Sequence, residues 1–386
     1  MAAGMRFTQY MAAVAICAGV LSAVRVRSQG VAFAPGVKVP VGAGPGEIAL
    51  VDLNGDRHLD MVTRHLLQKR VAVMLGDGAG GFAPAAGSPM TLAYQPGSIE
   101  VDDINGDGAP DLAVSISERD GVDVFLGDRK GTFTRAGGSP FAASASTSFF
   151  TRAIRMVDVN GDRRLDIITA NGSEHTIGVL LGGRGGFTAV PITRLGFRGG
   201  RSAAAFGDID GDGRVDAIAG HRGEDEDPAG RLSIFRGDGA GAFKEAGQLP
   251  IGAPGPFTIV LADVNGDRHL DVAVTHSHRN SLSVLLNDGR GAFTRAAGSP
   301  FDIRSEAFGL VTADIDGDRH ADLVAATGTN AVVLLGDGTG RFAAGPSFAA
   351  GLGAYNLAVG DINEDGKLDV VTSSFEGDAV SVLLRR

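Results

Sequence analysis

The chain has 386 residues, 59 of them Gly, and its formal net charge is −10, from 45 Asp and Glu against 35 Lys and Arg. Much of the acidic excess lies in one short repeated motif and the rest of the chain is net basic, so the overall charge indicates neither a basic partner nor a nucleic-acid partner. Without the lone cysteine, Cys17, the chain would contain no thiol, which is compatible with an oxidising compartment.

Residues 1–28 have the pattern of a secretory signal. Arg6 supplies a short basic region, residues 11–24 form an uncharged apolar run, and small residues near Ser22 and Ala23 offer a cleavage site. The alternative is an uncleaved membrane anchor, although about 14 apolar residues fall short of the roughly 20 that span a bilayer. A lipoprotein signal is disfavoured because Ile16 precedes Cys17 where a small residue is expected. No other segment is predicted to span a membrane, and residues 29–386 are expected to form one domain.

The repeat that starts near residue 97 illustrates the predicted unit. Residues 98–102, 112–115 and 122–126 are apolar or alternating runs typical of strands, and residues 132–134 begin a fourth. An Asp-rich loop joins the first two strands. Asp-Gly or Gly-Gly turns, suited to hairpins, join the third to the fourth, each followed by a Phe that we expect to pack between repeats. Such turns recur at residues 76–78, 182–184, 237–239, 287–289 and 336–338.

The Asp-rich loop occurs seven times, opening 47 to 55 residues apart. A fixed period of this size signals a repeat architecture, and four antiparallel strands per repeat match a propeller blade. The seventh repeat ends at Arg386 without a fourth strand, whereas residues 30–35 resemble the start of one. The sequence therefore predicts an all-β, seven-bladed β-propeller of four-stranded antiparallel blades. In this prediction residues 31–41 complete the last blade and leave no open sheet edge.

Each loop carries oxygen-bearing side chains at positions 1, 3, 5 and 9, the type of ligand that calcium prefers. Position 7 is chemically variable, so we expect only its backbone carbonyl to bind. Up to seven structural calcium ions are predicted. The expected ligands are, by loop, Asp52, Asn54, Asp56, His58, Asp60; Asp103, Asn105, Asp107, Ala109, Asp111; Asp158, Asn160, Asp162, Arg164, Asp166; Asp208, Asp210, Asp212, Arg214, Asp216; Asp263, Asn265, Asp267, His269, Asp271; Asp314, Asp316, Asp318, His320, Asp322; and Asp361, Asn363, Asp365, Lys367, Asp369.

EF-hands, metal-free turns and zinc sites fit the motif less well than calcium loops do. An EF-hand needs a bidentate Glu at position 12, where this chain has Thr, Val or Ala. Metal-free Asx turns do not require four acid or amide positions in every copy. The histidines at position 7 are expected to face solvent and not to bind zinc. Loops two and four, with Gly at position 6, are expected to bind calcium most tightly.

The stretch from Ala205 to Asp216 resembles the FG-GAP and VCBS repeats, as does the stretch that begins at Ala358. The resemblance covers residues 30–386. It implies a fold similar to the seven-bladed propeller at the N-terminus of integrin α chains, with calcium in the loop between the first two strands of each blade. Four loops depart from the pattern by carrying Arg at position 6, which leaves their occupancy open.

In an antiparallel meander, the Asp-rich loops and the Asp-Gly turns share one face. The loops between the second and third strands share the other face with the links between blades. These segments are longer and more variable, so we expect any ligand to bind there, near the central axis. Within them, His276 and His278 are expected on an exposed loop and not as metal ligands, residues 224–227 at a solvated tip, and Phe149–Phe150 either in the core or as a sugar platform.

Three functions remain open from the sequence. The favoured one is a secreted, periplasmic or cell-surface calcium-binding module, not an enzyme, that binds a protein or carbohydrate ligand as a monomer. The second is a propeller-type polysaccharide lyase or hydrolase, although no catalytic motif is present. The third is a structural surface component. Fold alone does not decide between them.

Overall fold

The computed structural model describes residues 30–386 except 143–150, 172–174, 196–201, 222–229 and 278. The predicted signal, Phe149–Phe150 and the acidic tip at residues 224–227 lie outside the described residues. Within them the chain forms β-strands and one 3₁₀ turn, η1 (Phe375–Gly377), and no α-helix is present. No helix of the described residues could therefore cross a membrane.

The strands pair as antiparallel meanders, so neighbours in sequence are neighbours in the sheet. The first two sheets contain β2 (Pro45–Val51), β3 (Asp60–His65), β4 (Arg70–Gly76), β5 (Phe82–Pro84) and β6 (Met90–Thr91), then β7 (Pro96–Asp102), β8 (Asp111–Ile116), β9 (Val122–Gly127) and β10 (Phe133–Arg135). The next two contain β11 (Thr151–Val157), β12 (Asp166–Asn171), β13 (Thr176–Gly183), β14 (Gly186–Ala189) and β15 (Thr193–Arg194), then β16 (Ser202–Gly207), β17 (Asp216–His221), β18 (Arg231–Gly237) and β19 (Phe243–Pro250).

The remaining strands form two sheets, one of them long. The shorter contains β20 (Pro256–Ala262), β21 (Asp271–His276), β22 (Ser281–Asn287), β23 (Phe293–Arg295) and β24 (Phe301–Asp302). The longer has seven strands, because β28 pairs with β27 through its first part and with β29 through its last. Its members are β1 (Val37–Pro40), β25 (Gly309–Ala313), β26 (Asp322–Ala326), β27 (Gly328–Gly336), β28 (Phe342–Gly360), β29 (Asp369–Ser374) and β30 (Ala379–Leu383).

The predicted fourth strand is split in three sheets. β5 pairs with the end of β4, and β6 pairs with its start. In the same way β14 and β15 pair with the end and the start of β13, and β23 and β24 pair with the end and the start of β22. The outer edge of these sheets is therefore more irregular than the predicted single strand.

The two ends of the described chain meet in the long sheet. β1 pairs antiparallel with β30, with Val37 opposite Val382 and Pro40 opposite Ala379. The predicted pairing between the N-terminal segment and the last repeat is thus present, and it places residues more than 300 positions apart in the sequence side by side.

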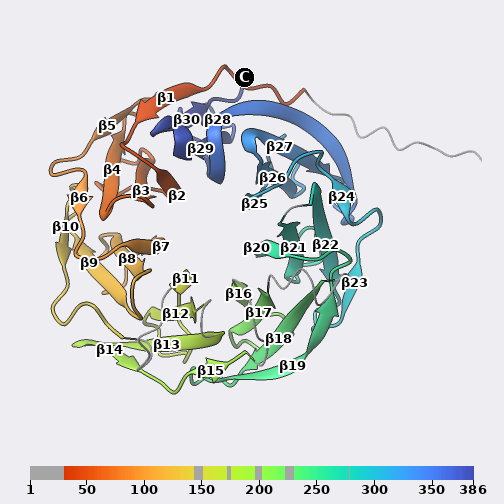
Figure 1. Cartoon of the computed structure of the whole chain (residues 1–386), viewed down its shortest axis with the longest axis horizontal. Coiled ribbons are helices and arrows are strands. Elements are labelled where there is room, and N and C mark those ends of the chain that lie inside the picture. Colours follow the sequence, from red (N-terminus) through yellow and green to blue (C-terminus); the bar gives the residue numbers. More distant parts are fainter. Residues whose placement is uncertain (1–29, 143–150, 172–174, 196–201, 222–229, 278) are drawn as a thin grey trace, which may run out of the picture.

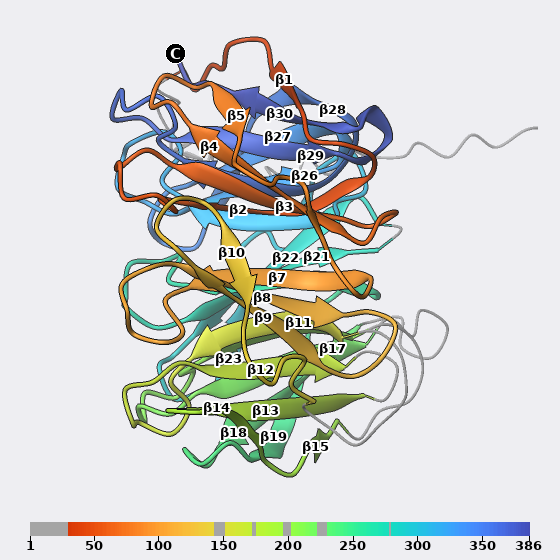
Figure 2. The same cartoon turned by 90° about the vertical axis from the view of Figure 1, so that its left-hand side faces the viewer.

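The sheets are arranged in a ring, with β2, β7, β11, β16, β20 and β25 nearest the centre (Figure 1). The core lies between neighbouring sheets. One buried cluster joins Val62 and Val71 of one sheet to Ile99, Leu112 and Phe125 of the next. The second strand of each sheet is covered on both faces, which explains its continuous apolar run. Connections lie on two opposite faces of the ring (Figure 2).

Candidate functional site

Seven loops of common geometry lie between the first and second strands of the repeats, here numbered one to seven from Asp52 to Asp361. The Asp at position 1 accepts the backbone N–H of position 6 in every loop, as Asp52 does from Arg57 at 2.8 Å. In six loops it also accepts the N–H of position 4, as Asp52 does from Gly55 at 2.7 Å. The first Asp therefore shapes the loop as well as offering its oxygens.

Position 6 is left-handed in all seven loops. Three loops place Gly there, whereas Arg57, Arg163, Arg268 and Arg319 adopt φ values of 67 to 76°. A side chain in this region costs about 1 kcal/mol or more of conformational energy. The loop conformation is thus kept even where the residue type opposes it, which indicates that the surrounding hydrogen bonds determine it.

The Asp at position 9 joins each loop to the rest of its sheet. Asp60 accepts the N–H of Leu53 at 2.8 Å with one oxygen and that of Gly76, at the end of β4, at 2.8 Å with the other. The same two bonds recur at all seven loops. Burial raises the pKa of all seven carboxyls, to about 6 for Asp271 and Asp322. Each of these buried carboxylates therefore holds its loop to the end of the third strand of the same blade through two backbone hydrogen bonds.

Two loops bring three carboxylates together. Among the described residues, Asp208, Asp210 and Asp216 of loop four, and Asp314, Asp316 and Asp322 of loop six, each place oxygens within 4.8 Å of one another. Both loops have Asp at position 3. In loop two Asn105 holds that position and donates its amide N–H to Asp107 at 3.0 Å, so only loop four of the two loops expected to bind most tightly carries such a cluster.

The donor set of loop six fits a divalent cation. Its three clustered side chains offer only oxygen, and Asp316 is 7% exposed. Burial and the neighbouring Asp318 and Asp314 raise the pKa of Asp316. Such crowding of like charges is relieved by a bound cation, and oxygen ligands are the kind that calcium prefers. Among the described residues, the carboxylate clusters of loops four and six are the two that could hold a metal ion.

The histidines at position 7 lie differently from one another. His269 and His320 are exposed, as expected. His58 is half-buried, and its Nδ1 hydrogen-bonds with Glu364, at position 4 of loop seven. This contact raises the pKa of His58. It links the first and last loops of the chain, which sequence spacing does not reveal.

His276 corrects one expectation. The sequence predicts it on an exposed loop, but it ends β21 and is 0% exposed. Its Nδ1 faces the carbonyl oxygen of Pro254 at 3.2 Å and its Nε2 faces Ser283 Oγ at 2.8 Å. Burial lowers its pKa to about 4. The residue is a neutral part of the core, because β21 continues beyond the apolar run that marks it in the sequence; His278 lies outside the described residues.

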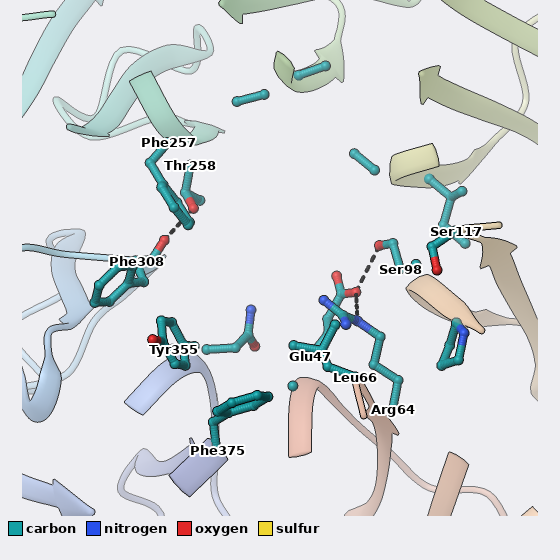
Figure 3. A pocket seen from close by; sticks show the side chains of 18 of the residues that line it. Glu47, Arg64, Leu66, Ser98, Ser117, Phe257, Thr258, Phe308, Tyr355 and Phe375 are labelled. Carbon is teal, nitrogen blue, oxygen red and sulfur yellow. Dashed lines mark hydrogen bonds and ion pairs between the residues drawn. The ribbon is translucent and has the colours of Figure 1, made fainter. Parts of the chain in front are cut away.

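A cavity of about 710 Å³, here called the central pocket, opens on the face opposite the loops. It is lined by the first residues of the innermost strands and by the loops between second and third strands (Figure 3). This is the region where the sequence predicts a ligand to bind. Its polar, charged and large apolar lining residues include Glu47, Arg64, Leu66, Ser98, Ser117, Phe257, Thr258, Phe308, Tyr355, Asn356 and Phe375.

One half of the central pocket is aromatic. Phe257, Phe308, Tyr355 and Phe375 form a continuous run with ring centroids 5.5, 4.6 and 5.5 Å apart. Three of these rings stand six positions before the first Asp of loops five, six and seven, where loops one and two have Gly. Comparing that position across the repeats would have revealed the asymmetry, which the Asp-rich motif by itself does not show.

The other half is polar. Glu47 Oε2 accepts hydrogen bonds from Ser98 Oγ at 2.8 Å, the N–H of Ile99 at 2.9 Å and Arg64 Nε at 3.3 Å. Arg64 Nη1 is buried without a hydrogen-bond partner among the described residues. A buried donor of this kind is costly unless a ligand or water satisfies it.

A ring of antiparallel sheets with Asp-rich loops on one face defines a β-propeller repeat protein. FG-GAP-like repeats match at residues 52–114, 103–169, 158–219, 223–274, 263–325 and 314–372. The chain therefore belongs to the FG-GAP-like repeat family, as its motifs indicated. No curated protein matches the sequence.

Solved structures agree on the fold. The chain is similar to BBS1N in complex with ARL6DN, at 13% identity and a TM-score of 0.63, over 92% of this chain and 98% of that one. It is also similar to an Agrocybe aegerita lectin that recognises non-reducing terminal N-acetylglucosamine, at 19% identity and a TM-score of 0.59, over 86% of each chain.

Proposed function

We propose that this chain is a secreted, calcium-stabilised β-propeller that binds a protein ligand in the central pocket and catalyses no reaction. The observation that carries the proposal is the aromatic run of the pocket together with the exposed apolar side chains beside it. In protein interfaces, most of the binding energy comes from a few side chains, often aromatic, that lie in pockets from which water is excluded. We further propose that the protein acts as a monomer.

The apolar side chains favour a protein ligand. The described residues contain five exposed large hydrophobic side chains, and Tyr355 and Leu66 line the central pocket. Leu67 follows Leu66 in the same loop, 66% exposed, and Leu352 precedes Tyr355 by three residues, 58% exposed. Exposed apolar side chains that gather beside a pocket are typical of a protein-binding surface. The Glu47 carboxylate across the pocket suits a cationic or hydroxyl-bearing side chain of the partner.

A glycan is the second candidate. Aromatic faces opposite Glu47, Arg64 and Ser98 offer stacking together with hydrogen bonds to hydroxyl groups, and one structurally similar protein is a lectin. The other similar structure is a complex with a protein. Neither likeness transfers a ligand to this chain, so the exposed leucines decide in favour of protein.

The proposal includes a seven-bladed ring. In this proposal the long sheet counts as two four-stranded blades that share β28, and β1 completes the second of them. Together with the other five sheets, these two blades make seven. The loops without an arginine among their carboxylates would hold calcium through positions 1, 3, 5 and 9 and the carbonyl of position 7. The bound ions would stabilise the fold at a distance from the ligand. Residues 1–28 would direct secretion and be removed.

The test is a selection of phage-displayed random peptides on the purified protein in calcium, with a glycan panel and release of soluble products followed in parallel. Peptides that carry an aromatic or aliphatic anchor should be enriched. Their affinity should fall at least about tenfold on Tyr355→Ala, the loss expected for an anchor worth about 1.4 kcal/mol or more.

The control is Val37→Ala, because Val37 is also an exposed hydrophobic side chain, at 57%, but lies on β1 at the outside of the ring (Figure 1). It should leave affinity unchanged. Equal losses in the two variants would refute the central pocket as the site. Retention of glycans without enrichment of peptides would replace the protein ligand by a sugar, and release of fragments would make the protein an enzyme.

A further inference from the structure

One position of the repeat is apolar in six copies and basic in one. It comes just before the residue whose N–H bonds the Asp at position 9, and it is Arg236 in the fourth repeat and Leu in the other six, namely Leu75, Leu126, Leu181, Leu286, Leu335 and Leu384. Three of the leucines pack against the next sheet, where a Cβ on Gly131, Gly340 or Gly80 would come within 2.8 Å of the leucine side chain. The position is thus an apolar contact between sheets, and an Arg there requires a separate reason.

The guanidinium of Arg236 reaches into loop four. Its Nη1 lies 3.0 Å from Asp210 Oδ2 and 2.9 Å from Asp216 Oδ2, and its Nη2 donates to the carbonyl oxygen of Arg290 at 3.3 Å. The Arg236 side chain is 26% exposed and that of Asp216 is 1% exposed. A positive charge therefore already lies between two of the three clustered carboxylates of loop four.

Loop six provides the comparison. It has the same three acids, Asp314, Asp316 and Asp322, but its sheet carries Leu335 at the position of Arg236. Within the described part of the chain, none of these carboxylates forms an ion pair with a basic side chain. Arg385 comes near, yet it donates to the backbone carbonyl of Asp316, at 2.6 Å.

A guanidinium and a calcium ion exclude each other in loop four. Calcium needs its oxygen ligands to converge at about 2.3–2.6 Å, and Arg236 Nη1 is bonded to two of those oxygens. Two cations so close together would repel. We propose that Arg236 takes the place of the metal ion in loop four, so that this loop keeps its shape without calcium while loop six depends on it. This inference rests on the proposed binding of calcium by the other loops, and it does not depend on which ligand the central pocket binds.

The test counts bound calcium by equilibrium dialysis in four proteins. Arg236→Leu, which restores the residue of the other six repeats, should bind one calcium ion more than the wild type. Adding Asp208→Asn to Arg236→Leu should remove that ion. Arg295→Leu, which removes an exposed arginine of β23 outside the seven loops, should bind as many ions as the wild type. A folded Arg236→Leu with an unchanged count would overturn the proposal.

A second variant keeps the test decisive if Arg236→Leu does not fold. Asp208→Asn in the wild-type background should leave the calcium count unchanged, because loop four holds no ion to lose; a count lower by one would contradict the proposal. Calcium in Arg236→Leu but none in the wild type would support Arg236 as the substitute cation and refute calcium in the other loops. No calcium in either protein would refute both.

Discussion

At the scale of single residues, His276 shows how position in a repeat overrides residue type. It stands five residues after Asp271, where other repeats have the buried residues Ile116, Thr327 and Ser374. Ser374 bonds the carbonyl of Leu352, 22 residues earlier, and His276 faces that of Pro254 at the same separation. The sequence pattern His-Ser-His indicated an exposed loop, but the repeat register correctly places this histidine with the buried strand ends.

The buried His276 predicts a dependence of stability on pH. Burial holds its pKa near 4 in the folded protein, against 6.5 for an unperturbed histidine, so below pH 6.5 the unfolded chain binds a proton that the folded chain does not. The free energy of unfolding should therefore fall as the pH drops from 6.5 toward 4, by up to about 3 kcal/mol from this residue. Denaturant unfolding at a series of pH values would measure it.

The control is His276→Asn, which places at this position the residue that the third repeat carries as Asn171. The buried acids with raised pKa, including Asp271 and Glu100, oppose the trend but act equally in both proteins. The wild type should lose stability on acidification relative to the variant. Parallel curves between pH 6.5 and 4 would show that His276 titrates normally.

At the scale of elements, the N-terminal strand β1 is only four residues long but joins the first part of the chain to the last. β1 covers the edge of β30, and Val39 joins the buried cluster formed with Val380, Val382 and Met61. This pairing could be predicted from the sequence because the last repeat lacks a strand that the first residues supply. The division of the fourth strand could have been predicted in two sheets, because Gly-Ser-Pro at residues 87–89 and 298–300 marks a turn between β5 and β6 and between β23 and β24.

Deletion of residues 30–42 should therefore prevent folding or lower the melting temperature severely. The deletion exposes the edge of β30 and removes the apolar side chains of Val39 and Val41 from the core. Thermal unfolding followed by circular dichroism would test it. A control that replaces exposed Val37 by Thr should melt like the wild type, whereas an unchanged melt after deletion would refute closure of the ring by β1.

At the scale of the whole molecule, the two faces differ in how well the sequence reveals them. The position of the Asp-rich loops between the first and second strands could be predicted, because each loop is local and every copy repeats the same spacing. The central pocket could not, since Phe257, Tyr355 and Glu47 come from different sheets and meet only when the ring forms. Arg236 is a similar case: its role depends on Asp210 and Asp216, which lie 26 and 20 residues away.

The two faces of the molecule are proposed to have different tasks, calcium-dependent stability for the loops and ligand binding for the central pocket. The measurement that tests this division most directly is the affinity of a selected peptide for Asp316→Asn and for Tyr355→Ala, both at saturating calcium. We predict that Asp316→Asn melts at a lower temperature but binds the peptide as the wild type does, and that Tyr355→Ala binds at least about tenfold more weakly. Loss of binding in a folded Asp316→Asn with normal binding in Tyr355→Ala would contradict the division and place the ligand on the loop face.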